Sequence, residues 1–425
     1  METTQQSVPK NWAPRFFIVW GGQAFSLFGS ALVQFALVWW LTKETGSATV
    51  LATATLVALL PQVILGPFVG ALVDRWNRRI IMMASDSSIA LFTLLLFYLF
   101  ATKQVQIWHV YAILALRSFG GAFQDPAMTA STSLMVPNKH LARIAGANQT
   151  LHGLLNIFAP PLGALLIELF STQNVLLVDI STAAFAVIPL FFVPIPQPAR
   201  RTKQVNGETK ETSYMHDLSE GFTYVVKWKG LLGVIILAML LNFMLVPASS
   251  FLPLIVTKVF HGGAAELGWV ESVFGVGVII GGVLLSVWGG FKRRIITSFI
   301  GIIGIGLGIV ITGLVPDNMF YLLLAANFLV GFMQVFANGP LMALMQSTVA
   351  PDMQGRVFSL LSAGATAMMP LSLLIAGPIS DALGIRFWYI LGGTVCIVMM
   401  LVAFFIPAII NIENNHQASP VPVAE

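Results

Sequence analysis

Charged residues are scarce in this chain. Asp, Glu, Lys and Arg together make up 9% of its 425 residues, against about 25% in soluble globular proteins. Hydrophobic residues make up 57%. So few charged side chains cannot cover the surface of a soluble globule of this size. The composition therefore excludes a soluble globular protein and predicts a protein that lies within a membrane.

Cysteine is nearly absent, since Cys396 is the only one. A single cysteine excludes an internal disulfide and a cysteine-based metal site. The six histidines show no metal-ligand spacing, and the sequence has neither a Gly-x-x-x-x-Gly-Lys-Ser/Thr loop nor a Gly-x-Ser-x-Gly elbow. The net charge of +4 comes from short loops, not from a basic patch interleaved with aromatic residues, which argues against nucleic-acid binding. We expect no cofactor, no metal site and no enzymatic activity.

Long apolar runs are abundant instead. A membrane-spanning helix needs roughly 20 apolar residues, and twelve such runs can be found. The predicted spans are 16–41, 48–73, 80–101, 106–130, 144–170, 173–193, 231–257, 265–289, 295–315, 319–347, 357–381 and 386–410. The first run is too long for a signal-peptide core, so we interpret it as an uncleaved helix. Pro247 and Pro253 predict a kink in the seventh span.

The order of these spans predicts an all-α membrane protein made of two six-helix halves. The only long hydrophilic interior stretch is 194–230, within which 217–229 could form an amphipathic surface helix. The predicted parts are a cytoplasmic N-terminus (1–15), an N-terminal half (16–193), a cytoplasmic linker (194–230), a C-terminal half (231–410) and a cytoplasmic tail (411–425).

The positions of Lys and Arg predict the orientation in the membrane. Most of the 22 lie near the termini or in the loops at 74–79, 137–143, 194–230, 291–294 and 351–356. With twelve spans, all of these segments lie on one side of the membrane. Because cytoplasmic loops carry an excess of Lys and Arg, we expect both termini in the cytoplasm.

Two loop patterns recur in the second half. The Gly-x-Leu that begins at Gly70 recurs at Gly282, and the Pro followed by Arg that begins at Pro137 recurs at Pro351. The shift along the chain from Gly70 to Gly282 is almost the same as the shift from Pro137 to Pro351. Such near-equal shifts predict two halves related by a pseudo-two-fold axis along the membrane normal, with a cavity between them.

The segment 70–79 reads Gly-Ala-Leu-Val-Asp-Arg-Trp-Asn-Arg-Arg and separates the second span from the third. It resembles the signature loop of the major facilitator superfamily, Gly-x-Leu-x-Asp-Arg-x-Gly-Arg-Arg, and departs from it only at Asn77. Because Asn tolerates left-handed backbone better than most residues, we expect the turn to be kept. The resemblance implies a twelve-helix major facilitator fold.

The same resemblance implies a conformational latch at the cytoplasmic end of the first half. In the superfamily, an acid at the end of the fourth helix, here Asp125, pairs with a basic position of the loop that corresponds to Arg78. Asp86 could join this cluster. The alternatives are that the arginines are only topology anchors and that Asp125 is a solvated end residue. The predicted latch residues are Gly70, Asp74, Arg75, Arg78, Arg79, Asp86 and Asp125.

Arg117 lies in the middle of the span 106–130. A charge at that depth costs about 2.5–3.5 kcal/mol on insertion scales, so we expect Arg117 to have a partner. Its Arg-x-x-x-Gly spacing resembles a superfamily motif linked to proton coupling; the alternative is a structural hydrogen-bond hub. Asp179 and Glu271 are the other candidate carboxylates, because a desolvated carboxylate binds a proton more readily. We predict that these three residues couple transport to protons, with interfacial positions as the alternative for the two acids.

Two polar stripes lie at helical spacing in the first and tenth spans, since positions i, i+3, i+4 and i+7 share one helical face. In the facilitator fold, the first, fourth, seventh and tenth helices line the substrate pathway. The alternative is interhelical hydrogen bonding without substrate contact. The predicted pathway residues are Gln23, Ser26, Ser30 and Gln34 in the first stripe, and Asn327, Gln334, Asn338 and Met342 in the second.

The fifth span contains Ala159, Pro160, Pro161 and Gly163. This stretch resembles a degraded form of the superfamily's antiporter motif, Gly-Pro-x-x-Gly-Gly. Its small residues predict that the spans 144–170 and 265–289 approach closely.

Further motifs across nearly the whole chain resemble the Mef-type macrolide efflux branch of the superfamily. They are Trp20-x-x-Gln23, Leu41-Thr42-x-x-Thr45-Gly46-Ser47, Arg117-Ser118, Asp125-Pro126-Ala127, Gly355-Arg356-Val357-Phe358-Ser359 and Gly377-Pro378. The resemblance implies a drug/proton antiporter of the bacterial inner membrane, with an amphipathic small-molecule substrate, protons and the lipid bilayer as its partners. We expect a monomer. An exporter of a siderophore or another metabolite with the same fold is the alternative.

Overall fold

A computed structural model describes residues 11–197, 214–350 and 353–414. Two predicted latch residues, Asp74 and Arg75, have side chains that lie outside the described residues, as do parts of the predicted terminus, linker and tail. Within the described ranges the chain is helical and has no strand. Its contacts divide it into two units, Met1–Lys203 with His261–Ser272, and Gln204–Phe260 with Val273–Glu425.

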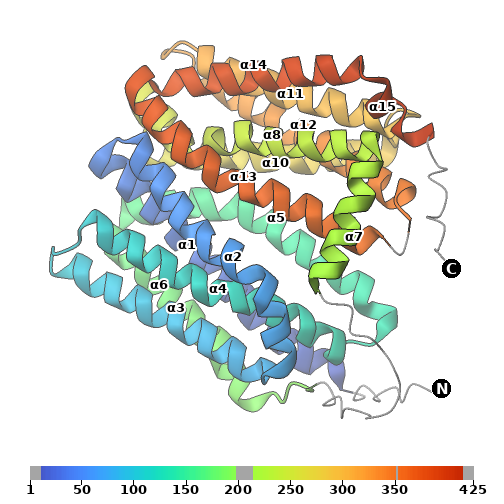
Figure 1. Cartoon of the computed structure of the whole chain (residues 1–425). Helices are drawn as coiled ribbons and strands as arrows, with labels where there is room; N and C mark the ends of the chain where they lie inside the picture. Colours follow the sequence, from blue (N-terminus) through green and yellow to red (C-terminus); the bar gives the residue numbers. More distant parts are fainter. Residues whose placement is uncertain (1–10, 198–213, 351–352, 415–425) are drawn as a thin grey trace, which may run out of the picture. The chain divides into compact units, whose positions relative to one another are not determined.

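The first unit holds six long helices that follow one another in the chain (Figure 1). They are α1 (Trp12–Thr45), α2 (Ala48–Arg75), α3 (Arg78–Ala101), α4 (Ile107–Met135), α5 (Asn138–Leu169) and α6 (Thr172–Phe192). The beginning of α10 also belongs to this unit.

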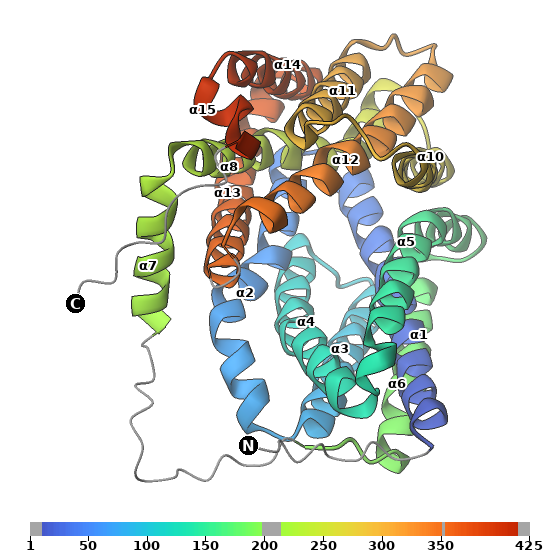
Figure 2. The same ribbon diagram turned by 90° about the vertical axis from the view of Figure 1, so that its right-hand side faces the viewer.

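The second unit holds the remaining long helices and several short ones. The long helices are α8 (Lys229–Ser250), α10 (Ala264–Trp288), α11 (Arg294–Leu314), α12 (Phe320–Thr348), α13 (Gln354–Leu383) and α14 (Ile385–Phe404). The short ones are α7 (Tyr214–Lys227), α9 (Leu252–Leu254), a π-helix (Ile255–Val259), α15 (Pro407–Ile410) and a 3-10 turn (Ile412–Asn414). Figure 2 shows α7 beside α13, where Arg356 forms an ion pair with Glu220 at 2.8 Å.

Eleven helices of the described residues are long and apolar enough to cross a membrane. The twelfth long helix, α4, is not among them. It carries Arg117, Gln124 and Asp125 along its length, and these residues lower its hydropathy.

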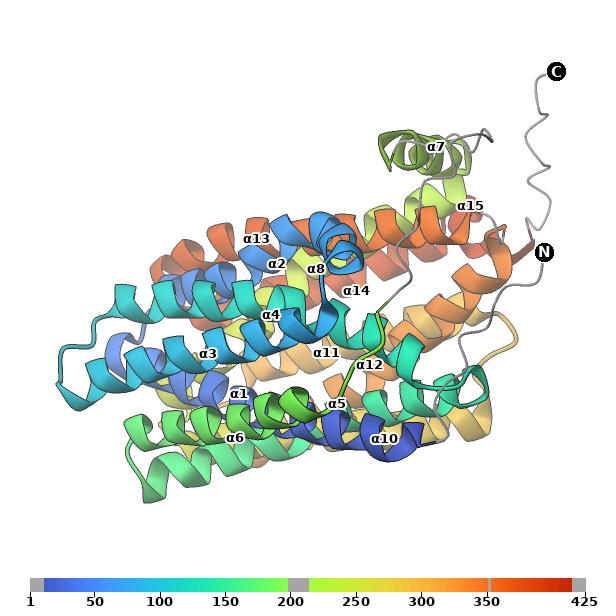
Figure 3. The same cartoon turned by 90° about the horizontal axis from the view of Figure 1, so that it is seen from below.

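Both units pack their helices in the same pairs. In the first unit α3 lies between α4 and α6 (Figure 3), and α1 contacts α5 and α6. In the second unit α11 contacts α12 and α14 in the same way, and α8 contacts α13 and α14. This repeated pairing matches the two recurring loop patterns found in the sequence.

Three local details bear on the sequence-based expectations. Asn77 is not left-handed, with φ −70° and ψ 110°; its side chain instead caps α3 by accepting from the backbone N–H groups of Arg79 and Ile80. The segment 137–143 is not a loop, because α5 begins at Asn138, directly after Pro137. The predicted kink in the seventh span corresponds to a break after Ser250, followed by the short helix α9 that contains Pro253, whereas Pro247 lies inside α8.

Candidate functional site

An ion pair between Arg117 of α4 and Asp179 of α6 lies in the interior of the first unit. The Arg117 guanidinium donates to Asp179 Oδ2 and to Thr93 Oγ1. The side chains of Arg117 and Asp179 are 10% and 1% exposed. The prediction that Arg117 has a partner is confirmed, and both Asp179 and Arg117 are removed from the ends of their helices.

Two further helices complete the surroundings of Asp179. Ser30 of α1 donates to Asp179 Oδ1 at 2.9 Å, and Thr93 of α3 donates to Oδ2 at 2.8 Å. Close approach of α1 and α6 depends on Gly29, since a Cβ there would collide with Asp179 and Thr182. Four helices therefore meet at one carboxylate, and any change in its charge acts on all four.

Asp86 of α3 forms a second buried cluster. Its Oδ2 accepts from Gln23 Nε2 at 2.7 Å, and its Oδ1 accepts from Ser26 Oγ at 3.1 Å and from Gln124 Nε2 at 2.6 Å. Asp86 is 1% exposed. These contacts join Asp86 of α3 to α1 and α4. Its part in the latch stays a prediction.

Arg78 and Arg79, the latch arginines whose side chains are described, are the first two residues of α3, and they bond to other helices. Arg78 is buried and donates through Nη1 to the Ala130 carbonyl of α4 at 2.7 Å, while Arg79 donates to the Phe191 carbonyl in the last turn of α6. Cations are favoured near helix C-termini. Gly70 has no atom within 4 Å of its ideal Cβ position. Asp125 is exposed, and its electrostatic neighbour is His152 of α5; its pairing with Arg78 stays a prediction.

Glu271 lies in the part of α10 that belongs to the first unit. Among the described residues, its half-buried carboxylate has no hydrogen bond or ion pair. The same stretch packs on α5, because Ser272 donates to the Ile157 carbonyl at 3.0 Å and a Cβ at Gly268 would meet Pro161 at 3.0 Å. The predicted close approach of the spans 144–170 and 265–289 is confirmed.

The two predicted polar stripes are each divided by burial. In α1, Gln23 and Ser26 are buried in the Asp86 cluster, and Ser30 contacts Asp179. Gln34 is the exposed member of this stripe. In α12, Asn327 is buried and donates to the Leu323 carbonyl of its own helix. The exposed residues of the α12 stripe are Gln334, Asn338 and Met342. Only the exposed members of each stripe are free to contact a substrate in this conformation.

Two residues of the clusters, Thr93 and Gln124, are not among the predicted site residues. Thr93 lies two helical turns after Asp86 on α3, and Gln124 lies two turns after Arg117 on α4. Positions i and i+7 place two side chains on the same helical face. The sequence signal for Thr93 and Gln124 is therefore their i+7 spacing from Asp86 and Arg117.

A cavity of about 350 Å³ lies between α1 and α5 in the first unit. It is lined by apolar side chains, and its volume lies within the range of about 300–1,000 Å³ that is usual for ligand pockets. Its lining residues are Ala24, Phe25, Phe28, Leu151, Leu154, Leu155 and Phe158.

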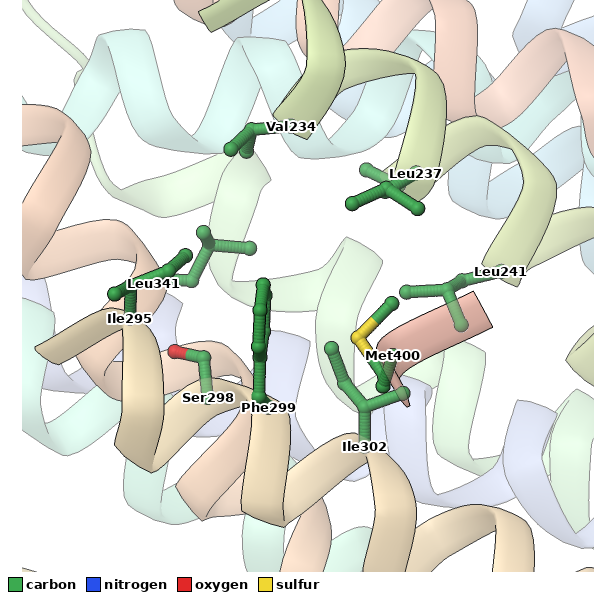
Figure 4. Close-up of a pocket in the computed structure, with 10 residues that line it drawn as sticks. Val234, Leu237, Leu241, Ile295, Ser298, Phe299, Ile302, Leu341 and Met400 are labelled. Atoms are coloured by element: carbon green, nitrogen blue, oxygen red, sulfur yellow. The ribbon is translucent and has the colours of Figure 1, made fainter. Parts of the chain in front are cut away.

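A much smaller cavity lies between α8 and α11 in the second unit (Figure 4). Its volume of about 30 Å³ leaves room for about one water molecule. Ser298 is its polar lining residue, and in the described part of the chain the Ser298 hydroxyl has no hydrogen-bond partner. This cavity is too small for a drug-sized substrate.

Comparisons with known proteins agree with this architecture. The family model described as Major Facilitator Superfamily matches residues 19–261 and 231–422. Macrolide efflux protein A of Streptococcus pyogenes is 33% identical over 396 residues, which cover 92% of this chain and 96% of that protein. The multidrug efflux pump Tap of Mycolicibacterium fortuitum is 25% identical over 401 residues, covering 91% of this chain and 94% of the pump.

Solved structures show the same fold. The nucleoside transporter NupG superposes with a TM-score of 0.68 at 13% identity and covers 92% of this chain and 98% of its own. A bacterial homologue of the iron transporter ferroportin, in an inward-facing state, gives a TM-score of 0.68 at 15% identity, with the same coverage. These relatives and structural neighbours are membrane transporters and not enzymes. The chain is a multi-pass membrane protein that belongs to the major facilitator superfamily of transporters, in its Mef-type branch.

Proposed function

We propose that this transporter exports amphipathic drugs such as macrolides from the bacterial cytoplasm by proton-coupled alternating access. The relatives named for macrolide and multidrug efflux support the type of substrate. The observation that carries the proton coupling is the buried Arg117–Asp179 ion pair, which joins α4 to α6 and is bonded to α1 and α3. Charged residues within membrane spans are expensive and commonly belong to ion or proton pathways.

The ion pair provides a means of linking protonation to helix movement. A proton on Asp179 would discharge the carboxylate and leave the Arg117 guanidinium without its counter-charge. An unpaired buried charge is strongly unfavourable, so α4 would move relative to α6 until Arg117 regained water or another acceptor. The proton would thus shift the balance between two conformations by its different affinity for each.

Glu271 is the second carboxylate in this proposal. It has no described partner for its charge and lies on α10 where that helix packs on α5. Protonation would remove the cost of an unpaired carboxylate in apolar surroundings. A proton on Glu271 would therefore favour the packed arrangement of α10, and proton loss would favour exposure of this stretch.

The substrate pathway would combine apolar and polar surfaces. The cavity between α1 and α5 offers three phenylalanines, Phe25, Phe28 and Phe158, to the apolar part of a drug. In the first unit, the exposed Gln34 of α1 would offer a hydrogen bond to its polar groups. In the second unit, Gln334 and Asn338 of α12 are exposed and remain predicted pathway residues. Such a mixture suits an amphipathic substrate, since apolar contacts give affinity and a few polar groups fix its orientation.

The junction of α2 with the start of α3 would latch one conformation. Arg78 and Arg79 hold the C-terminal ends of α4 and α6, and release of these bonds would free both helix ends to move. We place this junction and both termini in the cytoplasm, and the protein in the inner membrane as a monomer. Its halves would be 16–193 and 231–410, joined by the linker 194–230.

Transport in an efflux-deficient bacterial host tests the proposal. Wild-type cells are expected to accumulate less of a labelled macrolide than the empty host, and a protonophore should abolish the difference. Arg117→Gln, Asp179→Asn and Glu271→Gln, each with its membrane level measured, are expected to lose energised efflux. Asp317→Asn serves as the matched control, because Asp317 is exposed in a loop.

Two outcomes would contradict the proposal. Full energised efflux in all three variants would show that the coupling residues are wrong. Export of a siderophore without export of any macrolide, in a panel that contains both classes, would favour the metabolite exporter instead.

A further inference from the structure

The Asp86 cluster is a buried carboxylate held by neutral groups. Its three hydrogen-bond donors are the side chains of Gln23, Ser26 and Gln124, and all four residues of the cluster are at most 6% exposed. None of these donors carries a positive charge, whereas Asp179 has Arg117. The proposed coupling mechanism makes no use of Asp86.

Two opposing effects act on the protonation of the Asp86 carboxylate. Three donated hydrogen bonds stabilise the charged form, whereas burial without a cation favours the neutral form. The two effects oppose each other, so a change in these hydrogen bonds or in the burial of Asp86 can move a proton on or off. Groups balanced in this way are candidates for function.

The two amide side chains allow the cluster to accept either state. Gln124 Nε2 donates both to Asp86 Oδ1 and to Gln23 Oε1 at 2.7 Å, which fixes the orientation of its amide in the charged state. Half a turn of the Gln23 or Gln124 amide would present a carbonyl oxygen to Asp86 instead. A protonated Asp86 could then donate its own hydrogen bond, since a carboxylic acid has one O–H donor.

The same bonds argue for a proton rather than a metal cation. Both carboxylate oxygens of Asp86 already accept N–H or O–H groups, and these donors occupy the directions in which a cation would be coordinated. Na⁺-like hard cations need several free oxygens around them. A proton needs only one.

The cluster stands close to the Arg117–Asp179 pair. Thr93 lies two helical turns after Asp86 on α3, and Arg117 lies two turns before Gln124 on α4. Two turns correspond to a rise of about 10.5 Å along a helix. Asp179 accepts a hydrogen bond from Thr93, and its charge acts on Asp86. Because a negative charge attracts protons to its neighbours, a proton on one carboxylate weakens proton binding at the other, which links the two sites.

We propose that Asp86, held by Gln23, Ser26 and Gln124, is a proton-binding site of the first unit that is separate from the Arg117–Asp179 pair. Of the packed helices, α4 carries Arg117 and Asp125, and α6 carries Asp179. The charged residues of α1 are Arg15, Lys43 and Glu44 near its ends, and α1 contributes only neutral groups to the cluster. On α3 itself, Arg78 and Arg79 lie in the first turn. On α2, the side chains of Asp74 and Arg75 lie outside the described residues. This inference goes beyond the proposed function, because it needs no knowledge of the exported substrate.

Infrared difference spectroscopy of the full-length protein in lipid nanodiscs tests it. Spectra are compared between about pH 5 and about pH 9, in choline chloride, for wild type, Asp86→Asn, Asp179→Asn and the exposed control Asp317→Asn. Wild type is expected to show a C=O band of protonated carboxyl groups that titrates in this range. Asp86→Asn should lose one component of that band, and Asp317→Asn should retain it. The loss in Asp86→Asn should differ in frequency from any loss in Asp179→Asn.

Three results would overturn the proposal. The first is a band in Asp86→Asn that equals that of wild type and of Asp317→Asn. The second is a component that disappears when Na⁺ replaces choline, which would assign the cluster to a metal cation. If Asp86→Asn does not fold, Gln124→Leu is measured in its place. This variant removes one hydrogen-bond donor to the carboxylate and must move the titration midpoint of the component to higher pH. The third result is an unchanged midpoint, which excludes Asp86.

Discussion

The interior of the first unit is polar where the corresponding interior of the second unit is apolar. Three α1 positions, spaced as i, i+3 and i+7, contact the two buried carboxylates. The α8 positions with the same spacing line the small cavity of Figure 4. In order, these residues are Gln23, Ser26 and Ser30 in α1, and Val234, Leu237 and Leu241 in α8.

The α3 helix and its counterpart differ in the same sense. The shift along the chain that relates Gly70 to Gly282 also relates Asp86 to Ser298 of α11. Asp86 has three described donors, whereas Ser298 faces an apolar cavity without a described partner. The same place in the repeated architecture thus carries a polar cluster in one unit and a void in the other.

At the positions of the second unit that correspond to the Arg117–Asp179 ion pair, the helices are held by close backbone packing instead. The shift that relates Pro137 to Pro351 also relates Arg117 to Gly331 and Asp179 to Gly393. A Cβ at Gly331 would collide with the Phe274 carbonyl, and one at Gly393 would meet the Gly306 carbonyl at 2.6 Å. The two units therefore share helix pairing but hold it by different forces. We infer that the titratable, movable contacts belong to the first unit and that the second unit serves as a tightly packed support.

The largest expected effect on stability comes from removing one partner of the Arg117–Asp179 ion pair. Asp179→Leu leaves Arg117 buried without its counter-charge, which should lower the free energy of unfolding by about 3–5 kcal/mol. The double variant Arg117→Met, Asp179→Leu makes this place apolar, as in the second unit, and should recover most of that loss without recovering coupled efflux. Thermal unfolding in detergent measures both variants. A single variant as stable as wild type would show that the pair does not hold α4 to α6.

The next effect tests the packing of the second unit. Gly331→Ala places a methyl group against the Phe274 carbonyl, and such overpacking should destabilise the protein by about 1–3 kcal/mol. Gly282→Ala is the matched control on α10, because nothing lies within 4 Å of its ideal Cβ position. The control should be neutral or stabilising by up to about 1 kcal/mol, since Ala favours helices over Gly. Equal effects of the two substitutions would exclude glycine packing as the basis of this unit.

Much of the fold could be predicted from the sequence, because membrane spans need long apolar runs and Lys and Arg mark the loops. The need of Arg117 for a partner could also be predicted, since an isolated charge is expensive in a membrane. Its choice of Asp179 could not, because that depends on which faces of α4 and α6 meet. The Asp86 cluster was missed for the same reason: Gln23 and Ser26 form a polar stripe, and a stripe looks the same whether it faces a substrate or a buried carboxylate.

The smallest effect gives the sharpest comparison, because one chemical change is made in both units. Ser26→Ala removes a 3.1 Å hydrogen bond to Asp86 and should lower the free energy of unfolding by about 1 kcal/mol. Ser298→Ala removes a buried hydroxyl without a described partner, so it should be neutral or slightly stabilising. Unfolding midpoints of the two variants in the same detergent give the difference directly. Equal losses would mean that a buried water satisfies Ser298 in its cavity, and the contrast between a polar and an apolar interior would then be weaker than the side chains alone suggest.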